Sequence, residues 1–280
     1  MLTRLPEIEN AFHALAIDEA RGNFPPTLWY LDSGCYKGDK PLVNLKQVWF
    51  PGYHSDVGGH SKGSIDTNSI DEIAFSWMCD QLVGLLQLSA TVLQKCILFR
   101  LGDYNLITQG KDKDIKNQDA HWRKVEWNNG VINDNNGWLD PWWVTSVIST
   151  RKASYKRVPG ETKAYEDKAK KIPINYKNFN EEIHPCVRHR VDGATEQKYH
   201  PAPFRDGWKY VAPTKTTRGH WKKGSGDKEV VLYEYTIPEP APFHAGIGIE
   251  HWQGSLERAF APKAVLAAQA PFVTKPATGN

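Results

Sequence analysis

The sequence predicts an α/β fold, and three segments near its start carry that prediction. Residues 5–20 have the apolar spacing of a helix, residues 45–50 are typical of a buried strand, and a capped helix begins at Ser69 after a long loop. Helices that alternate with strands along a chain are characteristic of domains in which helices cover a sheet.

The first segment is predicted to be helical because its apolar residues recur at three- and four-residue steps. This stripe consists of Leu5, Ile8, Phe12 and Leu15. Pro6 suits the first turn of a helix, and Gly22 suits the position just after its end. The expected helix therefore covers residues 5–20.

The next two elements have clearer boundaries. The strand contains Val48, Trp49 and Phe50 and ends at Pro51-Gly52. In the following helix, Ser69 and Glu72 can form a capping box. Its buried face is expected at Ile70, Ile73, Ala74, Trp77, Gln81 and Leu85, of which Gln81 is the polar member.

One further strand is predicted in the second half of the chain, at residues 230–237. Apolar and aromatic side chains alternate there with other residues, as they do along a strand with one covered face. The face is expected to hold Val231, Tyr233, Tyr235 and Ile237.

Composition limits the class of protein more than it defines a function. The net charge of +3 gives no argument for binding nucleic acid or an anionic membrane. No stretch is long and apolar enough to span a bilayer, and the first residues contain no signal core. The four cysteines are scattered without a Cys-x-x-Cys pair, which favours free thiols in a reducing compartment. We therefore expect a cytoplasmic protein that has no cofactor and binds no nucleic acid, whose oligomeric state the sequence does not indicate.

The loop after the strand at 45–50 is the segment most informative about chemistry. His54 follows the strand closely, and catalytic groups of α/β sheets gather beyond the carboxyl ends of strands. An imidazole can take and return a proton near neutral pH, so His54 is a candidate general base. From the residues alone it is equally a simple loop histidine. Asp56 either organises the loop through backbone N–H groups or holds a ligand.

The motif Trp49-Phe50-x-Gly52-x-His54-x-Asp56-Val57-Gly58-Gly59 resembles the signature of an α/β-hydrolase domain family that has many fungal members. This family includes the type VI secretion phospholipase effectors. The similarity begins at residues 13–19 and continues through residues 71–78. It weakens to echoes at residues 137–138 and 183–188 and extends to about Arg258.

The resemblance implies an α/β-hydrolase fold and serine-hydrolase chemistry on ester bonds, which are phospholipid-like in the bacterial relatives. It makes His54 the catalytic base and Asp56 a second candidate catalytic residue whose role it does not define. In such enzymes the histidine lies between the last strand and the last helix, after the serine and the acid in chain order. His54 has this context.

The sequence departs from the family pattern upstream of His54. The family places a Gly-x-Ser-x-Gly nucleophile elbow and a Trp-Asp-Thr-Val-like strand before these motifs, and the 53 residues that precede His54 contain neither. We therefore expect the C-terminal portion of an α/β-hydrolase fold, inactive as written. Because the strand at 45–50 would lack its neighbours in the sheet, poor solubility is also expected.

Two alternatives for this loop are weaker. Gly59-His60-Ser61-Lys62-Gly63 matches the elbow pattern, but Ser61 follows the histidine and no strand directly precedes it, as an elbow requires. His54, Asp56 and His60 are suitable ligands for zinc or iron, yet no second cluster completes the coordination shell. No metal site is therefore predicted.

Other conspicuous residues have structural explanations. We expect His13 to be packed and hydrogen-bonded. His184 and His189 are expected to be structural or exposed, and Lys222-Lys223 to lie in an exposed loop. Trp142-Trp143 is expected to form a packed connection.

Three parts follow from these observations. Residues 1–105 are the hydrolase-like part, residues 106–258 an appended irregular and partly β lobe, and residues 259–280 a disordered tail. Two functions stay open. The first is a truncated lipase- or phospholipase-like serine hydrolase, which would act on an ester or lipid substrate when complete. The second is a non-catalytic remnant or binding module of the same fold, and an in-frame elbow upstream of Met1 would distinguish the two.

Overall fold

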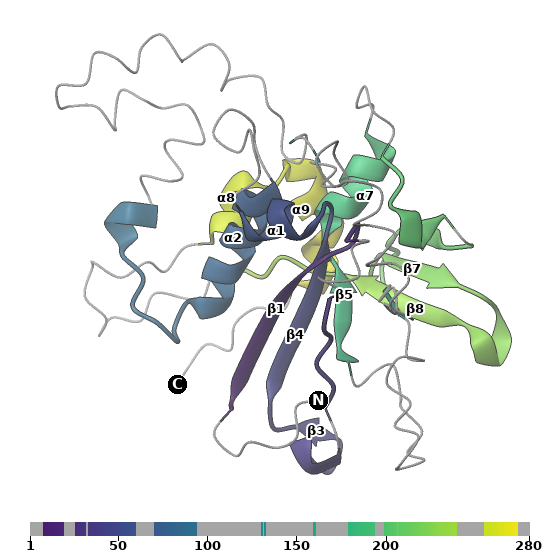
Figure 1. Cartoon of the computed structure of the whole chain (residues 1–280), viewed down its shortest axis with the longest axis horizontal. Helices are drawn as coiled ribbons and strands as arrows, with labels where there is room; N and C mark the ends of the chain where they lie inside the picture. The colour runs from purple at the N-terminus through teal and green to yellow at the C-terminus, as the bar shows by residue number, and fades with distance from the viewer. Residues whose placement is uncertain are drawn as a thin grey trace, which may run out of the picture.

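The structure is a computed structural model, and its described residues form a mostly parallel sheet with helices packed on it (Figure 1). It describes residues 8–19, 26–31, 33–59, 70–93, 130, 132, 159–160, 179–193, 199–205, 207–239 and 255–273. The α/β class predicted from the sequence is confirmed at this level.

The main sheet has six strands in the order β1-β4-β5-β8-β7-β6. Its members are β1 (Asn10–Ala16), β4 (Asn44–Phe50), β5 (Glu181–Ile183), β8 (Val230–Glu234), β7 (His220–Lys223) and β6 (Lys209–Val211). The first four strands pair in parallel, and β8, β7 and β6 pair antiparallel. Two short strands, β2 (Tyr36–Lys37) and β3 (Lys40–Pro41), form a separate antiparallel pair.

The helices gather mainly on one face of this sheet, over β1 and β4 (Figure 1). They are α1 (His54–Gly58), α2 (Ile70–Leu82), α8 (Leu256–Phe260) and α9 (Lys263–Gln269). A further helix, α7 (Pro185–Asp192), follows β5, and short 3-10 turns occupy Ser33–Cys35, Ala202–Phe204, Gly226–Lys228 and Ala270–Phe272. None of the helices in the described ranges is long and apolar enough to cross a bilayer.

The helix predicted over residues 5–20 is wrong, because Asn10–Ala16 form strand β1. The side chains alternate between the two faces of the sheet, as strand geometry requires. Phe12, Ala14 and Ala16 pack toward α2, whereas Ala11 and Leu15 pack on the opposite face. All seven residues of β1 pair in register with β4, and this pairing outweighs the weak helical preference of the segment.

Strand β4 confirms the prediction for residues 45–50, but its surroundings differ from those expected. It pairs with β1 on one side and with β5 on the other, so neither edge is open. Val48, Trp49 and Phe50 are fully buried. The reason for expecting poor solubility, an unpaired strand at this position, is therefore wrong.

The second half of the chain contributes to the same sheet as the first half. Strands β5 and β8 lie within residues 106–258, the expected appended lobe, and they continue the sheet from β4. Lys222 and Lys223 lie in β7 and not in a loop. Part of the segment expected to be disordered forms α9, whose Val265 is buried against the core around α2.

The two remaining predictions, a helix and a strand, are confirmed as elements, but parts of their expected buried faces are wrong. Helix α2 buries the expected face, except that Leu85 lies beyond the helix end and is 48% exposed. Ser69 lies outside the described residues. Strand β8 confirms residues 230–234 of the second prediction. The face expected to be buried is wrong within β8, because Leu232 and Glu234 are the buried residues while Tyr233 is 41% exposed. Tyr235 and Ile237 are buried as expected, but they follow the strand.

Candidate functional site

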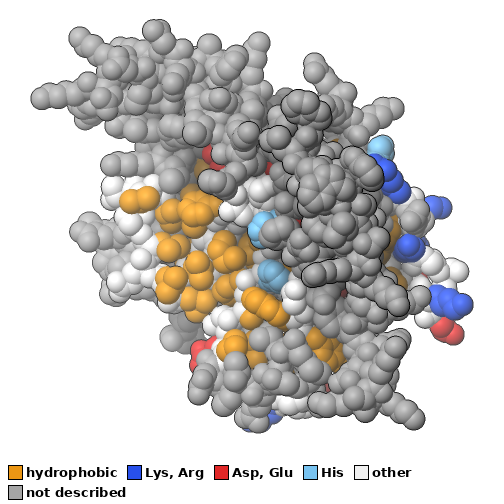
Figure 2. Space-filling view, in the orientation of Figure 1, with side chains coloured by type: hydrophobic (Ala, Val, Ile, Leu, Met, Phe, Trp, Pro, Cys, Tyr) orange, Lys and Arg blue, Asp and Glu red, His pale blue; other side chains and the backbone are white. Residues whose placement is uncertain are grey.

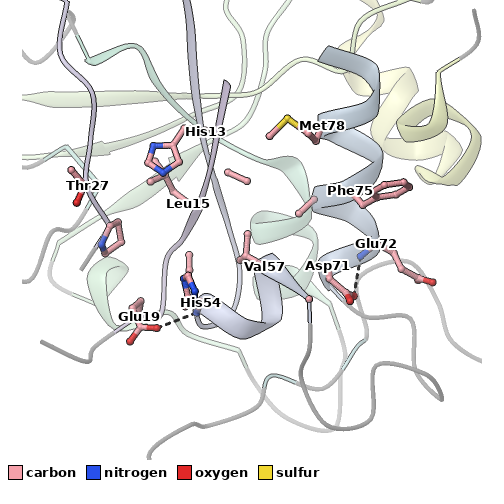
Figure 3. A pocket seen from close by; sticks show the side chains of 16 residues that line it. His13, Leu15, Glu19, Thr27, His54, Val57, Asp71, Glu72, Phe75 and Met78 are labelled. Carbon is pink, nitrogen blue, oxygen red and sulfur yellow. Dashed lines mark hydrogen bonds between the residues drawn. The ribbon is translucent and has the colours of Figure 1, made fainter. Parts of the chain in front are cut away.

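His54 is the first residue of α1, directly beyond the carboxyl end of β4. Its backbone N–H donates a hydrogen bond to Glu19 Oε2 at 3.1 Å. Glu19 follows β1, which is the parallel neighbour of β4. The ends of two adjacent strands therefore bring a histidine and a carboxylate to the same place (Figure 3).

The turn that carries His54 depends on Gly52. Its φ of 98° is in the left-handed region, and a Cβ there would lie 2.7 Å from Asp56 Cβ. Any other residue would be strained and would collide with Asp56. The backbone N–H of Gly52 donates to Asp18 Oδ2 at 2.7 Å, and the backbone N–H of Asp18 donates to the Gly52 carbonyl at 3.1 Å. Asp18 thus fixes the turn from the neighbouring strand.

Asp56 organises the loop, which is one of the two roles that the sequence left open. Its carboxylate is buried, and Oδ2 accepts the backbone N–H of Tyr53 at 2.9 Å. Negative charge in the first turn of a short helix is also favourable. The side chain therefore shapes the segment that holds His54.

Asp18 is a candidate functional residue that the sequence reasoning did not single out. Besides Gly52, its Oδ2 accepts the hydroxyl of Tyr199 at 2.6 Å. Burial raises the pKa of Asp18, while the bonds from Tyr199 and Gly52 and the nearby Arg190 act to lower it. The sequence signal for Asp18 is its position just after a strand. This signal is lost when residues 5–20 are predicted to be a helix.

A cavity of about 750 Å³ opens beside His54 (Figure 3). Strand β1 and the residues after it line one side, Pro26 and Thr27 another, and α2 the third. Three carboxylates reach the cavity, from Glu19, Asp71 and Glu72, and no lysine or arginine of the described chain lines it. The cavity is therefore partly apolar and carries negative charge.

His13 also lines this cavity, in addition to the packed role expected for it. Its Nδ1 lies 3.4 Å from Gln47 Oε1, and its ring stacks on Trp29 at 4.6 Å. Burial lowers the pKa of His13, and the bond to Gln47 partly opposes that effect. The contacts with Gln47 and Trp29 thus fix the ring of His13 in place.

Other residues with a possible functional role lie partly inside and partly outside the described ranges. Ser61, His60 and Trp142-Trp143 lie outside the described residues. Within the described ranges, no group of three or more His, Cys, Asp or Glu side chains has metal-binding geometry. His189 lies in α7 and is partly buried, and His184 is fully buried, as expected for structural residues.

Comparison with known families gives one match. Residues 2–81 match the family described as T6SS, phospholipase effector Tle1-like, catalytic domain. Over this segment the chain is similar to a phospholipase catalytic domain. The segment contains β1, β4, α1 and nearly all of α2, and therefore His54, Asp18 and Glu19. No curated protein and no solved structure matches the chain.

Proposed function

We propose that this chain carries the base and acid of a phospholipase-like serine hydrolase of the α/β-hydrolase class. The observation that carries the proposal is the placement of His54 beside the carboxylates that follow β1, within the segment similar to a phospholipase catalytic domain. His54 would take the proton of a serine nucleophile and return it to the leaving group.

The acid would come from the pair Asp18 and Glu19. Both precede His54 in the chain and lie at the end of the adjacent strand, which agrees with the order of serine, acid and histidine in α/β-hydrolases. Asp18 is the more buried and holds the turn, whereas Glu19 lines the cavity with His54. The residue that orients the imidazole is identified by comparing the activity of Asp18→Asn with that of Glu19→Gln at equal protein stability.

The substrate would be a lipid ester. Val57, Phe75 and Met78 give the cavity an apolar wall, and the side chain of Phe75 is 52% exposed. An acyl chain gains free energy from covering such a surface. Val57 belongs to the same short helix as His54 and lies beside it, so the apolar lining reaches the histidine (Figure 3).

The nucleophile would come from outside the residues that line the cavity, since none of those described is a serine. We infer that a polypeptide with a Gly-x-Ser-x-Gly elbow, encoded upstream in frame or on a partner chain, completes the site. The chain by itself would then be inactive.

The experiment maps the 5′ end of the transcript and expresses any in-frame extended product. Its hydrolysis of phosphatidylcholine vesicles is then compared with that of two alanine variants. His54→Ala should lower kcat by roughly 10³-fold or more. His13→Ala, a matched histidine in the same cavity, should change kcat by less than about tenfold. Equal loss in both variants would overturn the proposal.

A second candidate is a non-catalytic binding module with the same fold. The absence of a serine among the described cavity residues favours it. Two results together would support this alternative: the transcript contains no upstream elbow, and the chain without a partner hydrolyses no ester.

A further inference from the structure

Two adjacent carboxylates hold the turn that carries His54. Asp18 Oδ2 accepts the backbone N–H of Gly52 at 2.7 Å. Glu19 Oε2 accepts the backbone N–H of His54, two residues further along the same turn, at 3.1 Å. The position of His54 therefore depends in part on an Asp18 side chain that is fixed and ionised, because an ionised carboxylate is the stronger acceptor.

The carboxylate of Asp18 is also held by a residue that is distant in sequence. The hydroxyl of Tyr199 donates to the same oxygen, Oδ2, at 2.6 Å, across 181 positions of the chain. Tyr199 is 9% exposed and packs in the apolar cluster that contains Leu15 and Ile17, on the face of the sheet opposite α2. One oxygen of Asp18 thus joins the turn of His54 to the segment that follows α7.

A buried arginine of α7 lies beside this hydrogen bond. The guanidinium carbon of Arg190 is 5.3 Å from the centre of the Tyr199 ring, and Arg190 is 7% exposed. On the face shown in Figure 2, lysine and arginine side chains instead gather at the surface on the side of β7 and β8. Arginine is rarely buried unless a negative group compensates its charge. For Arg190, Asp18 and Asp56 are the carboxylates close enough to act on its pKa.

Both residues favour the ionised form of Asp18. Burial raises the pKa of Asp18, whereas the hydrogen bonds from Tyr199 and Gly52 and the charge of Arg190 lower it; the charge of Asp56 raises it further. A buried carboxyl group without such partners tends to take up a proton. Tyr199 and Arg190 therefore help Asp18 to remain a strong acceptor for the N–H of Gly52.

We propose that Tyr199 and Arg190 are positioning residues for His54, because they hold the carboxylate of Asp18 against the turn that carries the histidine. Neither residue lies within residues 2–81, the segment similar to a phospholipase catalytic domain. The second half of the chain thus supplies groups on which the geometry of the site depends. The proposal rests on the proposed function, in that the turn is held for proton transfer at His54.

The test compares Tyr199→Phe with Tyr235→Phe in the full chain. Each change removes one buried hydroxyl that donates to a carboxylate, since the hydroxyl of Tyr235 donates to Glu257 Oε2 at 3.3 Å. NMR gives the amide exchange rate at Gly52 and the ring signal of His54, and urea denaturation gives the free energy of unfolding. Tyr199→Phe should make exchange at Gly52 at least tenfold faster and shift the ring signal of His54. Tyr235→Phe should do neither, even where it destabilises the protein as much.

Two arginine variants separate the effect of charge from that of packing. The carboxyl group of Asp18, followed by carbon NMR, should titrate at a higher pH in Arg190→Gln than in the wild type, because a charge that lowers its pKa is removed. Arg190→Lys keeps the positive charge and should titrate closer to the wild type. A role of Arg190 in packing alone would leave the titration of Asp18 unchanged.

The proposal is overturned if Tyr199→Phe leaves Gly52 exchange or the His54 signal unchanged, if Tyr235→Phe changes them equally, or if Asp18 titrates at the same pH in Arg190→Gln as in the wild type. None of these measurements depends on ester hydrolysis. NMR results as expected, together with an extended product that hydrolyses no ester, would therefore contradict the hydrolase proposal alone. In an active extended product, Tyr199→Phe should lower kcat at least tenfold with little change in KM, and an unchanged kcat would also overturn the positioning role.

Discussion

Two histidines follow adjacent parallel strands of the same sheet, yet their environments are opposite. His54 follows β4, is exposed and lines an open cavity. His184 follows β5 and is 1% exposed, with its ring stacked on Phe50 at 4.7 Å. Position at the carboxyl end of a strand is therefore not enough to make a histidine a catalytic candidate. The cavity at His54 measures about 750 Å³ and the one at His184 only about 10 Å³, and this difference in space separates them.

The hydrogen bonds of His184 explain why it is structural. Its Nδ1 accepts the backbone N–H of Cys186 at 3.2 Å, so Nε2 carries the proton and donates it to Glu257 Oε1 at 2.9 Å. Burial lowers the pKa of His184 to about 3. The ring is thus locked as a neutral donor that holds α8 against the sheet, and it does not gain a second proton near neutral pH.

Glu257→Ala, which removes the hydrogen-bond partner of His184, is expected to have the largest effect on stability. Glu257 accepts from His184 Nε2 and, at 3.3 Å, from the hydroxyl of Tyr235, so its removal leaves two buried donors without an acceptor. The free energy of unfolding should fall by about 3–5 kcal/mol in urea denaturation. Glu257→Gln keeps an acceptor for His184 and should cost about half as much. Equal losses would contradict this account of the network.

Stability should also depend on pH through the same region. Burial raises the pKa of Glu257 to about 8, and burial with the neighbouring Glu257 raises that of Asp80 to about 7. The protonated carboxyl groups of Asp80 and Glu257 stabilise the fold. Their contribution to the free energy of unfolding is therefore present below about pH 4 and is lost as pH rises to about 8. The lowered pKa of His184 has the opposite effect below about pH 6.5, where it makes the free energy of unfolding increase as pH rises.

The free energy of unfolding should therefore decrease by roughly 2–3 kcal/mol between about pH 5.5 and pH 8. Urea midpoints measured across this range provide the check. Glu257→Gln should make the dependence shallower. A wild-type free energy of unfolding that rises over the same range would show that these carboxyl groups are ionised in the fold.

Asp18→Ala tests whether the turn near His54 is held from β1. It removes the acceptor of the Gly52 N–H and of the Tyr199 hydroxyl. The free energy of unfolding should fall by about 1–3 kcal/mol. Amide exchange at Gly52 should also become faster. Unchanged exchange at Gly52 would mean that the turn is fixed by Asp56 alone.

His54→Ala is expected to have the smallest effect on stability. Its side chain is exposed, so the free energy of unfolding should change by less than about 0.5 kcal/mol. His184→Ala should destabilise the protein by several times that amount. A large loss of stability in His54→Ala would remove the difference between the two histidines.

The sequence indicated the parts of this fold that depend on local pattern. Strand β4, helix α2 and the loop with His54 were predicted because each has its own apolar spacing or turn residues. Strand β1 was missed because its pairing with β4 is not visible in local spacing. The roles of Asp18 and Glu19 depended on that strand, so they were missed as well.

The sequence also does not predict how buried polar residues are paired. Gln81 was the exception on the apolar face of α2, and it donates to the Tyr235 hydroxyl at 3.0 Å and accepts from Lys46 at 2.6 Å. These partners lie far away in the chain. Polar residues inside a core are explained by such distant partners, which no local pattern reveals.

Whether His54 activates a serine nucleophile is measured by the rate at which a fluorophosphonate labels the serine of an in-frame, elbow-containing product. We expect rapid labelling of the wild type, a loss of roughly 10³-fold in the labelling rate of His54→Ala, and little change in that of His13→Ala. Labelling of His54→Ala at the wild-type rate would show that His54 does not activate the nucleophile and would contradict the account.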